Sequence, residues 1–191
     1  MTNVKSVLLV IALLLAGIIL VGCSSGSGAG SQPPATRARA KDSEAPAAKV
    51  GAGVGNTAPD FRLTRMDGSA VSLGDLRGGP AVLVFWTAWC PACKEEAPHV
   101  NELAAKYGPR GVRVLGINIM DSEARAAGGI KEFGIRYDVA RDPDASVTRL
   151  YQVTGTPTII LLDRGGVVRY VGHALPEDFS ARLDALLADR G

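Results

Sequence analysis

Hydrophobic and polar positions along the chain predict alternating strands and helices from about residue 56 onward. Ala81–Trp86 is a continuous apolar run, as expected for a strand buried on both faces of a sheet, and Val112–Ile119 is expected to be a second buried strand. Between them, apolar positions in Pro91–Tyr107 recur at helical spacing. Three further helical stretches are expected, at Ser122–Phe133, at Ala145–Tyr151, and at the C-terminus, where Phe179, Leu183, Leu186 and Leu187 share one face.

Two hairpins are predicted from turn residues that separate short strand-like runs. Asp67-Gly68 divides the stretch Phe61–Leu73, and Arg164-Gly165-Gly166 lies between Thr158–Asp163 and Val167–Val171. Strands that alternate with helices indicate an α/β fold with a central mixed sheet flanked by helices. The first hairpin would be an N-terminal extension of that sheet.

The first 55 residues lack the pattern of a folded domain. The apolar run Val7–Val21 is shorter than the roughly 20 residues of a membrane-spanning helix, and it fits the core of an export signal over residues 1–22. The sequence LVGC that ends at Cys23 resembles the bacterial lipobox, in which the cysteine is lipidated. An ordinary cleaved signal and an uncleaved anchor stay open. Residues 23–55, rich in Ser, Gly, Ala and Pro, predict a flexible tether before a domain at 56–191.

Composition and charge narrow the possible functions. The 191 residues are 47% hydrophobic, enough for one packed domain, and the net charge of +2 does not indicate a surface for nucleic acid. Lipidation of Cys23 would leave two free thiols, Cys90 and Cys93. It would also place them outside the cytoplasm, on a cell membrane, where disulfides persist.

The motif Cys90-Pro91-Ala92-Cys93 lies where the first buried strand meets its helix. Unpaired N–H groups and the positive end of the helix dipole favour a thiolate at Cys90. Pro91 suits the first helical turn, where no N–H is needed. Cys93 lies one turn further, within reach of Cys90. These features predict that Cys90 attacks a disulfide and that Cys93 resolves the mixed disulfide.

Other uses of a cysteine pair fit the chain less well. A structural zinc site needs four ligands, and only His99 and His173 accompany the two thiols, so no metal is expected. A purely structural disulfide across so short a loop would constrain the unfolded chain little. A copper carrier with two thiolates and a histidine stays open, although copper-chaperone thioredoxin folds space their cysteines three residues apart.

The stretch FWTAWCPACKEEAP, residues 85–98, resembles the active site of the thioredoxin superfamily. The lipobox, the lead-in from Ala58 to Gly78 and GTPTIILLD at 155–163 are similar to the TlpA/ResA-like group of membrane-attached thiol–disulfide oxidoreductases. The resemblance covers about residues 56–191. It implies a thioredoxin-like fold and a redox-active Cys90–Cys93 pair, with no bound cofactor.

Several roles are implied by this resemblance alone. Pro157 matches the cis-proline beside the two cysteines, and Thr156 before it would pair with an extended substrate segment as an added strand. A trans proline that opens a strand is the alternative. Trp86 is expected to pack in the core. Substrate contacts are implied for Trp89, Pro91 and Ala92.

One departure from the family concerns the proton acceptor. Thioredoxin keeps a buried acid six residues before its first cysteine, where this chain has Val84. A base for Cys93 must then come from elsewhere. Asp121 follows the second buried strand, where ResA-like members carry an active-site acid, but it could equally cap the next helix. Glu96 matches another acid common in the group, with a solvated helix surface as the alternative.

Members of this group often reduce the cysteines of apocytochrome c before haem attachment, using electrons from an integral-membrane thiol partner. The leading hypothesis is therefore a lipid-anchored reductase of apocytochrome c or other exported proteins. The direction depends on a reduction potential that the residues between the cysteines do not reveal, so a disulfide-introducing oxidase stays open. A peroxiredoxin-like peroxidase would need Pro-x-x-x-Thr-x-x-Cys; Thr87 fits this frame, but Leu83 replaces the proline.

Overall fold

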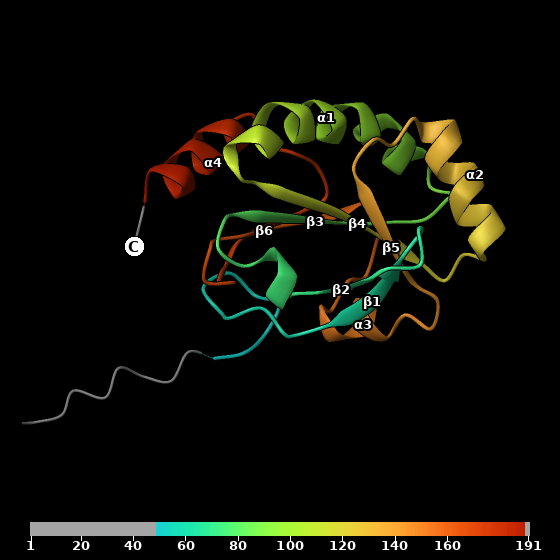
Figure 1. Cartoon of the computed structure of the whole chain (residues 1–191), viewed down its shortest axis with the longest axis horizontal. Coiled ribbons are helices and arrows are strands. Elements are labelled where there is room, and N and C mark those ends of the chain that lie inside the picture. Colours follow the sequence, from blue (N-terminus) through green and yellow to red (C-terminus); the bar gives the residue numbers. More distant parts are fainter. Residues whose placement is uncertain (1–48, 190–191) are drawn as a thin grey trace, which may run out of the picture. The chain divides into compact units, whose positions relative to one another are not determined.

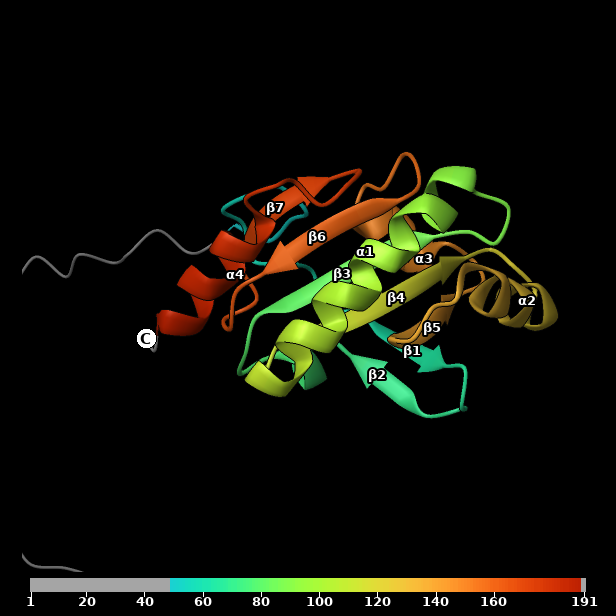
Figure 2. The ribbon, with the colours of Figure 1, turned by 90° about the horizontal axis from the view of Figure 1, so that it is seen from above.

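A seven-stranded mixed sheet organises the computed structural model, which describes residues 49–189 (Figures 1 and 2). The strand order is β2-β1-β5-β4-β3-β6-β7. The central β3, β4 and β5 are parallel, and the remaining pairings are antiparallel. The strands are β1 Arg62–Arg65, β2 Ala70–Ser72, β3 Ala81–Trp86, β4 Arg113–Ile119, β5 Asp138–Asp142, β6 Thr158–Leu162 and β7 Val168–Gly172.

Helices cover both faces of this sheet (Figure 1). The helices α1, α2 and α4 lie over one face, and the short α3 lies under the other, beside the β1–β2 hairpin. The α/β thioredoxin-like architecture expected from the sequence is confirmed. The helices are α1 Pro91–Tyr107, α2 Glu123–Phe133, α3 Ser146–Leu150 and α4 Phe179–Ala188, with 3₁₀ turns at Gly74–Leu76 and Gly108–Arg110.

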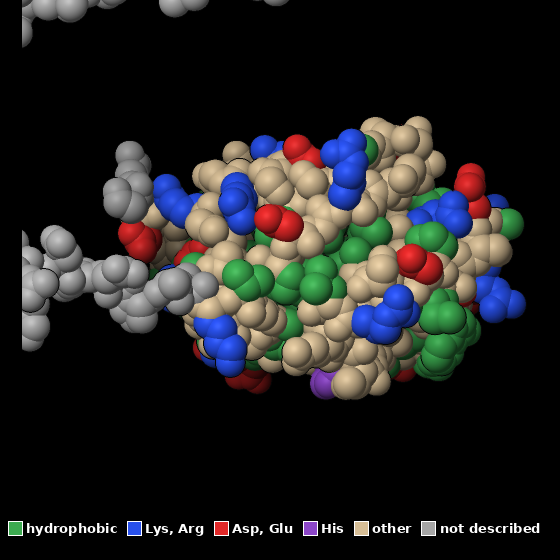
Figure 3. Space-filling view, turned by 90° about the horizontal axis from the view of Figure 1, so that it is seen from below, with side chains coloured by type: hydrophobic (Ala, Val, Ile, Leu, Met, Phe, Trp, Pro, Cys, Tyr) green, Lys and Arg blue, Asp and Glu red, His purple; other side chains and the backbone are tan. Residues whose placement is uncertain are grey.

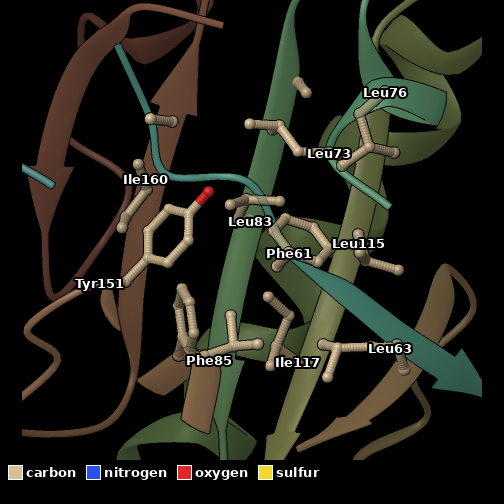
Figure 4. Packing of buried hydrophobic residues seen from close by; sticks show 14 of the residues in the cluster. Phe61, Leu63, Leu73, Leu76, Leu83, Phe85, Leu115, Ile117, Tyr151 and Ile160 are labelled. Carbon is tan, nitrogen blue, oxygen red and sulfur yellow. The ribbon is translucent and has the colours of Figure 1, made fainter. Parts of the chain in front are cut away.

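The two faces of β3 belong to two different hydrophobic clusters. Val82 and Val84 pack under α1 and α4, whereas Leu83 and Phe85 join the opposite cluster (Figure 4). In that second cluster the Phe85 ring lies 5.7 Å from the Tyr151 ring, measured between centroids. Alternate residues of a strand point to opposite faces. Burial on both faces therefore explains why β3 is apolar throughout.

One strand, β5, was not predicted from the sequence. Its residues, DVARD, lack a continuous apolar run, and only Val139 and Ala140 are hydrophobic. The polar residues are paired by the tertiary structure instead. The Arg141 guanidinium lies 2.9 Å from Glu123, and fully buried Asp142 accepts hydrogen bonds from the Thr148 N–H and hydroxyl. Charged residues can occupy a buried strand when each finds a partner.

The described chain is already attached to the domain before residue 56. The Thr57 N–H donates to the Lys49 carbonyl, the Gly55 N–H donates to the Val168 carbonyl, and Ala52 is buried. The last residues of the expected tether therefore lie against β7. The signal at 1–22, Cys23 and most of the tether lie outside the described residues.

No helix within residues 49–189 is long and apolar enough to cross a membrane. On the face turned away from α1, basic side chains are interspersed with acidic ones (Figure 3). Ion pairs of the described domain include Arg77–Asp60 and Arg169–Asp163. This mixture agrees with the small net charge of the chain.

Candidate active site

A disulfide joins Cys90 and Cys93 at the junction of β3 and α1. Cys90 is the N-cap residue of α1, and its sulfur accepts a hydrogen bond of 3.1 Å from the Cys93 N–H. Pro91 is the first helical residue, so no backbone donor is lost there. After reduction, the same N–H and the helix dipole would stabilise negative charge on the Cys90 sulfur.

The segment before β6 approaches the disulfide from another part of the chain. The Thr156–Pro157 peptide bond is cis, as the resemblance to the TlpA/ResA-like group implied. The Thr156 carbonyl oxygen lies 3.4 Å from the Cys90 sulfur, although the two residues are 66 positions apart. The fold therefore brings Thr156 and Pro157 to the cysteine pair.

Two hollows of different character flank the disulfide. An open groove of about 320 Å³ borders Cys90, and Trp89 beside it is 69% exposed. A cavity of about 10 Å³ borders Cys93 on the inner side, close to the smallest volume that holds one water. Both cysteines are buried, at 5% and 4% exposure, and Cys90 is the one that borders the open groove. The groove is lined by Ala88, Trp89, Cys90, Pro91, Lys94, Glu132 and Phe133.

The inner cavity contains polar groups next to Cys93. Glu96 is the acidic residue among those that line it, and the carboxylate oxygen Oε1 accepts a 2.8 Å bond from the Leu175 N–H. Burial, and secondarily the charge of Glu96, raises the pKa of the Tyr137 phenol, so this group stays protonated at neutral pH. The Glu96 side chain is only 13% exposed, and its second oxygen, Oε2, lies 3.3 Å from Nδ1 of the exposed His99, so Glu96 is not a freely solvated surface group.

Asp121 lies under the loop that precedes the cysteines. Its side chain is buried, and Oδ2 accepts hydrogen bonds from the Ala88 N–H at 2.7 Å and the Asn118 amide at 2.9 Å. The cap of α2 is Ser122, whose hydroxyl accepts from the Arg125 N–H, so the capping role considered for Asp121 is wrong. Asp121 does not line the cavity beside Cys93. Its observed contacts hold the loop two residues before Cys90.

Three groups near the site were not identified from the sequence. Asn118 is a buried polar residue between Ile117 and Ile119 of β4, which is the signal that could have revealed it. Tyr137 and the Leu175 N–H give no sequence signal, because only folding brings them to Glu96. Within residues 49–189, no three His, Cys, Asp or Glu side chains come together as a metal site.

The loop before Cys90 is packed closely against α2, and two adjacent glycines test this contact. A Cβ on Gly129 would lie 2.8 Å from the Ala88 Cβ and 2.9 Å from the Trp86 ring, whereas a Cβ on Gly128 would meet nothing within 4 Å. We expect Gly129→Ala to lower the free energy of unfolding by about 1–3 kcal/mol through overpacking. Gly128→Ala should raise it by about 0.5–1 kcal/mol through helix propensity.

Chemical denaturation of both glycine variants measures these changes. Both replacements add the same methyl group to neighbouring residues of one helix, so the Gly128 variant is the control for propensity. Gly129→Ala should also change the alkylation rate of Cys90 in the reduced protein, since the loop must shift. Equal stability of the two variants would contradict the close packing.

Comparison with known proteins agrees with this geometry. The model of the AhpC/TSA family matches residues 54–171. Thiol-disulfide oxidoreductase ResA of Geobacillus kaustophilus is 34% identical over 140 residues, which cover 72% of this chain and 80% of the relative. A Chlorobium tepidum structure assigned as thiol:disulfide interchange protein DsbE is 32% identical, with a TM-score of 0.64, and covers 69% of this chain and 95% of its own.

A third similarity is to the structure of a secreted Mycobacterium tuberculosis disulfide oxidoreductase. It is 26% identical, with a TM-score of 0.57, and the match covers 67% of this chain and 94% of the other. The fold and the Cys90–Cys93 pair thus define a thioredoxin-fold thiol–disulfide oxidoreductase. The chain belongs to the AhpC/TSA family, and it is a homologue of the ResA thiol-disulfide oxidoreductases.

Proposed function

We propose that this protein is a membrane-tethered reductase that acts outside the cytoplasm on disulfides of exported proteins, with apocytochrome c as a candidate substrate. The observation that carries the proposal is the asymmetry of the cysteine pair. Cys90 borders an open groove, whereas Cys93 borders a small inner cavity lined by Glu96. This arrangement supports one attacking thiol and one resolving thiol.

The proposed reaction moves two electrons from the protein to its substrate. The Cys90 thiolate attacks one sulfur of the substrate disulfide; the substrate S–S bond breaks and its other sulfur leaves as a thiolate. Cys93 transfers its proton to Glu96, through one water or directly, and attacks the Cys90 sulfur. The second substrate thiolate is released and the Cys90–Cys93 disulfide forms. A membrane thiol partner would reduce that disulfide again.

Asp121 and Thr156 support this reaction without exchanging electrons. Asp121 would fix the loop before Cys90 through the Ala88 N–H. Thr156, whose carbonyl lies beside the Cys90 sulfur, would align the substrate segment as an added strand. Trp89, Pro91 and Ala92 would form the substrate contact surface, because Trp89 is exposed next to Cys90.

The direction of electron flow can be tested by the reduction potential of the cysteine pair. For a reductase we expect a value closer to the roughly −270 mV of thioredoxin than to the roughly −120 mV of DsbA. Equilibration with glutathione buffers of known ratio measures it, and thiol trapping in cells shows which form is present. A potential near that of DsbA, with the disulfide form prevailing in cells, would indicate an oxidase instead.

A peroxidase is the second candidate, favoured by the AhpC/TSA family match. Leu83 occupies the position at which the peroxidatic frame has proline, although Thr87 is present. The test is peroxide consumption by the reduced protein in the absence of a disulfide substrate. Rapid consumption that requires Cys90 alone would replace the reductase proposal. Tight Cu(I) binding without disulfide exchange would indicate a copper carrier.

The location depends on Cys23, and its substitution gives a direct test. We expect Cys23→Ala to move the protein from the membrane fraction to the soluble extracytoplasmic fraction, because stable anchoring needs more than one acyl chain and none would be attached. Fractionation followed by immunoblotting measures the change. A matched Ser24→Ala variant should stay on the membrane. Membrane retention of the Cys23 variant would indicate an uncleaved signal anchor.

A further inference from the structure

The segment that follows β7 contacts two separate parts of the cysteine site. The Nδ1 atom of His173 lies 2.8 Å from the Pro157 carbonyl oxygen, which can only accept, so the imidazole donates this hydrogen bond. Two residues later, the Leu175 N–H donates to the Glu96 carboxylate over 2.8 Å. Residues 173–175 therefore connect the segment beside Cys90 with the acid beside Cys93.

The position of these three residues is fixed from within β7. The Tyr170 hydroxyl donates a 2.6 Å hydrogen bond to the Ala174 carbonyl, and its ring packs edge-on against Phe179 of α4. A Cβ on Gly172 would collide with the same hydroxyl, so any other residue there would displace the Tyr170 side chain. The segment is thus held on both sides of the residues that contact the site.

The two residues that this segment contacts, Pro157 and Glu96, both line the cavity beside Cys93. Pro157 follows Thr156, whose carbonyl lies 3.4 Å from the Cys90 sulfur, and Pro157 also lines the cavity beside Cys93. Glu96 lines the same cavity. A shift of His173 or Leu175 would therefore move groups that surround both sulfurs, and misplacement of such groups slows a reaction steeply.

We propose that residues 173–175 are a positioning element of thiol–disulfide exchange, with His173 holding Pro157 and the Leu175 N–H orienting Glu96. The His173 part depends only on the exchange reaction itself, whichever direction the electrons take. The Leu175 part rests on the proposed function of Glu96 as the proton acceptor. Neither residue touches the substrate, and both act through their partners.

The hydrogen bond from His173 to Pro157 is tested with two replacements, one that keeps a hydrogen-bond donor and one that lacks it. An asparagine amide can place its N–H near the position of Nδ1, whereas leucine has no donor. We expect His173→Leu to slow the reaction of the reduced protein with oxidised glutathione about fivefold, the equivalent of one hydrogen bond of about 1 kcal/mol. His173→Asn should remain within about twofold of the wild type, since the hydrogen bond is kept.

Stopped-flow rates, with denaturation curves of the same samples, give the result. Equal rates for wild type and His173→Leu, or equal loss in the leucine and asparagine variants, would overturn the positioning role of His173. A loss of stability without a rate change would also overturn it, because it would show a merely structural contact.

The Leu175 contact is tested at the backbone. Leu175→Pro removes the N–H that Glu96 accepts, whereas Leu175→Ala keeps it. We expect the proline variant to change the pH profile of mixed-disulfide release by Cys93, and the alanine variant to match the wild type. If Glu96→Gln changes the pH profile and Leu175→Pro does not, the proposed role of the Leu175 N–H in orienting Glu96 is wrong. If Glu96→Gln does not change the pH profile either, the proposed function of Glu96 as proton acceptor fails instead. If the Leu175→Pro variant does not fold, the rates of the His173→Leu and His173→Asn variants decide the proposal.

Discussion

Replacement of Cys93 by serine will leave a protein that forms a mixed disulfide with its substrate and cannot release it. Cys90 keeps its place at the N-terminus of α1, with the residue 93 N–H as donor, so its attack is preserved. The hydroxyl of serine cannot replace the second thiolate in disulfide exchange. The covalent complex should therefore accumulate, and multiple turnover should fall by several orders of magnitude, as when one member of a cooperating catalytic pair is removed.

Non-reducing electrophoresis and mass spectrometry of purified complexes measure this result. Cys90→Ser is the matched control, since it removes one sulfur from the same pair and should trap almost nothing. If the Cys90→Ser variant formed mixed disulfides through Cys93 as fast as the Cys93→Ser variant forms them through Cys90, the assignment of Cys90 as the attacking thiol would be wrong. The trapped proteins would at the same time identify the natural substrates, because capture occurs in the proper compartment.

The two tryptophans of the same stretch should respond to alanine in opposite ways. Trp86 is 2% exposed and packs on Phe133 with ring centroids 5.8 Å apart, whereas Trp89 is 69% exposed. We expect Trp86→Ala to lower the free energy of unfolding by about 3–5 kcal/mol, because a buried aromatic side chain is lost and a cavity remains. Trp89→Ala should change it by no more than about 0.5 kcal/mol.

Under conditions where both variants are folded, exchange with protein disulfides should be reduced more by Trp89→Ala than by Trp86→Ala. Trp89→Ala removes an exposed apolar contact beside Cys90 and should weaken exchange with protein disulfides, while the reaction with oxidised glutathione stays close to wild type. Denaturation curves and the two exchange rates, measured on the same samples, separate the effects. A large loss of stability in the Trp89 variant would mean that its side chain packs on the domain in solution.

The order of strands and helices could be predicted from the sequence wherever burial leaves a periodic signal. Ala81–Trp86 is apolar on both faces because both hydrophobic clusters use it, and its bounds agree with those of β3. Strand β5 escaped prediction because Asp138, Arg141 and Asp142 interrupt its apolar residues. The partners of Arg141 and Asp142 come from α2 and α3, and Asp138 pairs with Arg65 of β1, so a local pattern cannot include these contacts.

The same distinction holds for the site. The spacing of Cys90 and Cys93, with Pro91 at the helix start, is a local feature, and the sequence alone was enough to predict the redox pair at the N-terminus of a helix. The sequence also named Asp121 and Glu96 as candidate acids, but it left the role of each open. Asp121 lies against Ala88 and does not cap its helix, and Glu96 is largely buried beside Cys93.

By itself, the sequence determined an α/β pattern of strands and helices and a cysteine pair at a helix start, and its resemblance to the TlpA/ResA-like group implied the thioredoxin-like fold and the cis-proline. The α/β pattern and the cysteine pair depend on residues that are neighbours in the chain, where backbone geometry and side-chain chemistry act directly. The N-terminal export pattern stays a prediction. Only the tertiary structure decided which thiol faces the groove and which acid lines the cavity, and that His173 and Leu175 support the site. These contacts join residues up to 79 positions apart, and chain folding alone brings them within hydrogen-bonding distance.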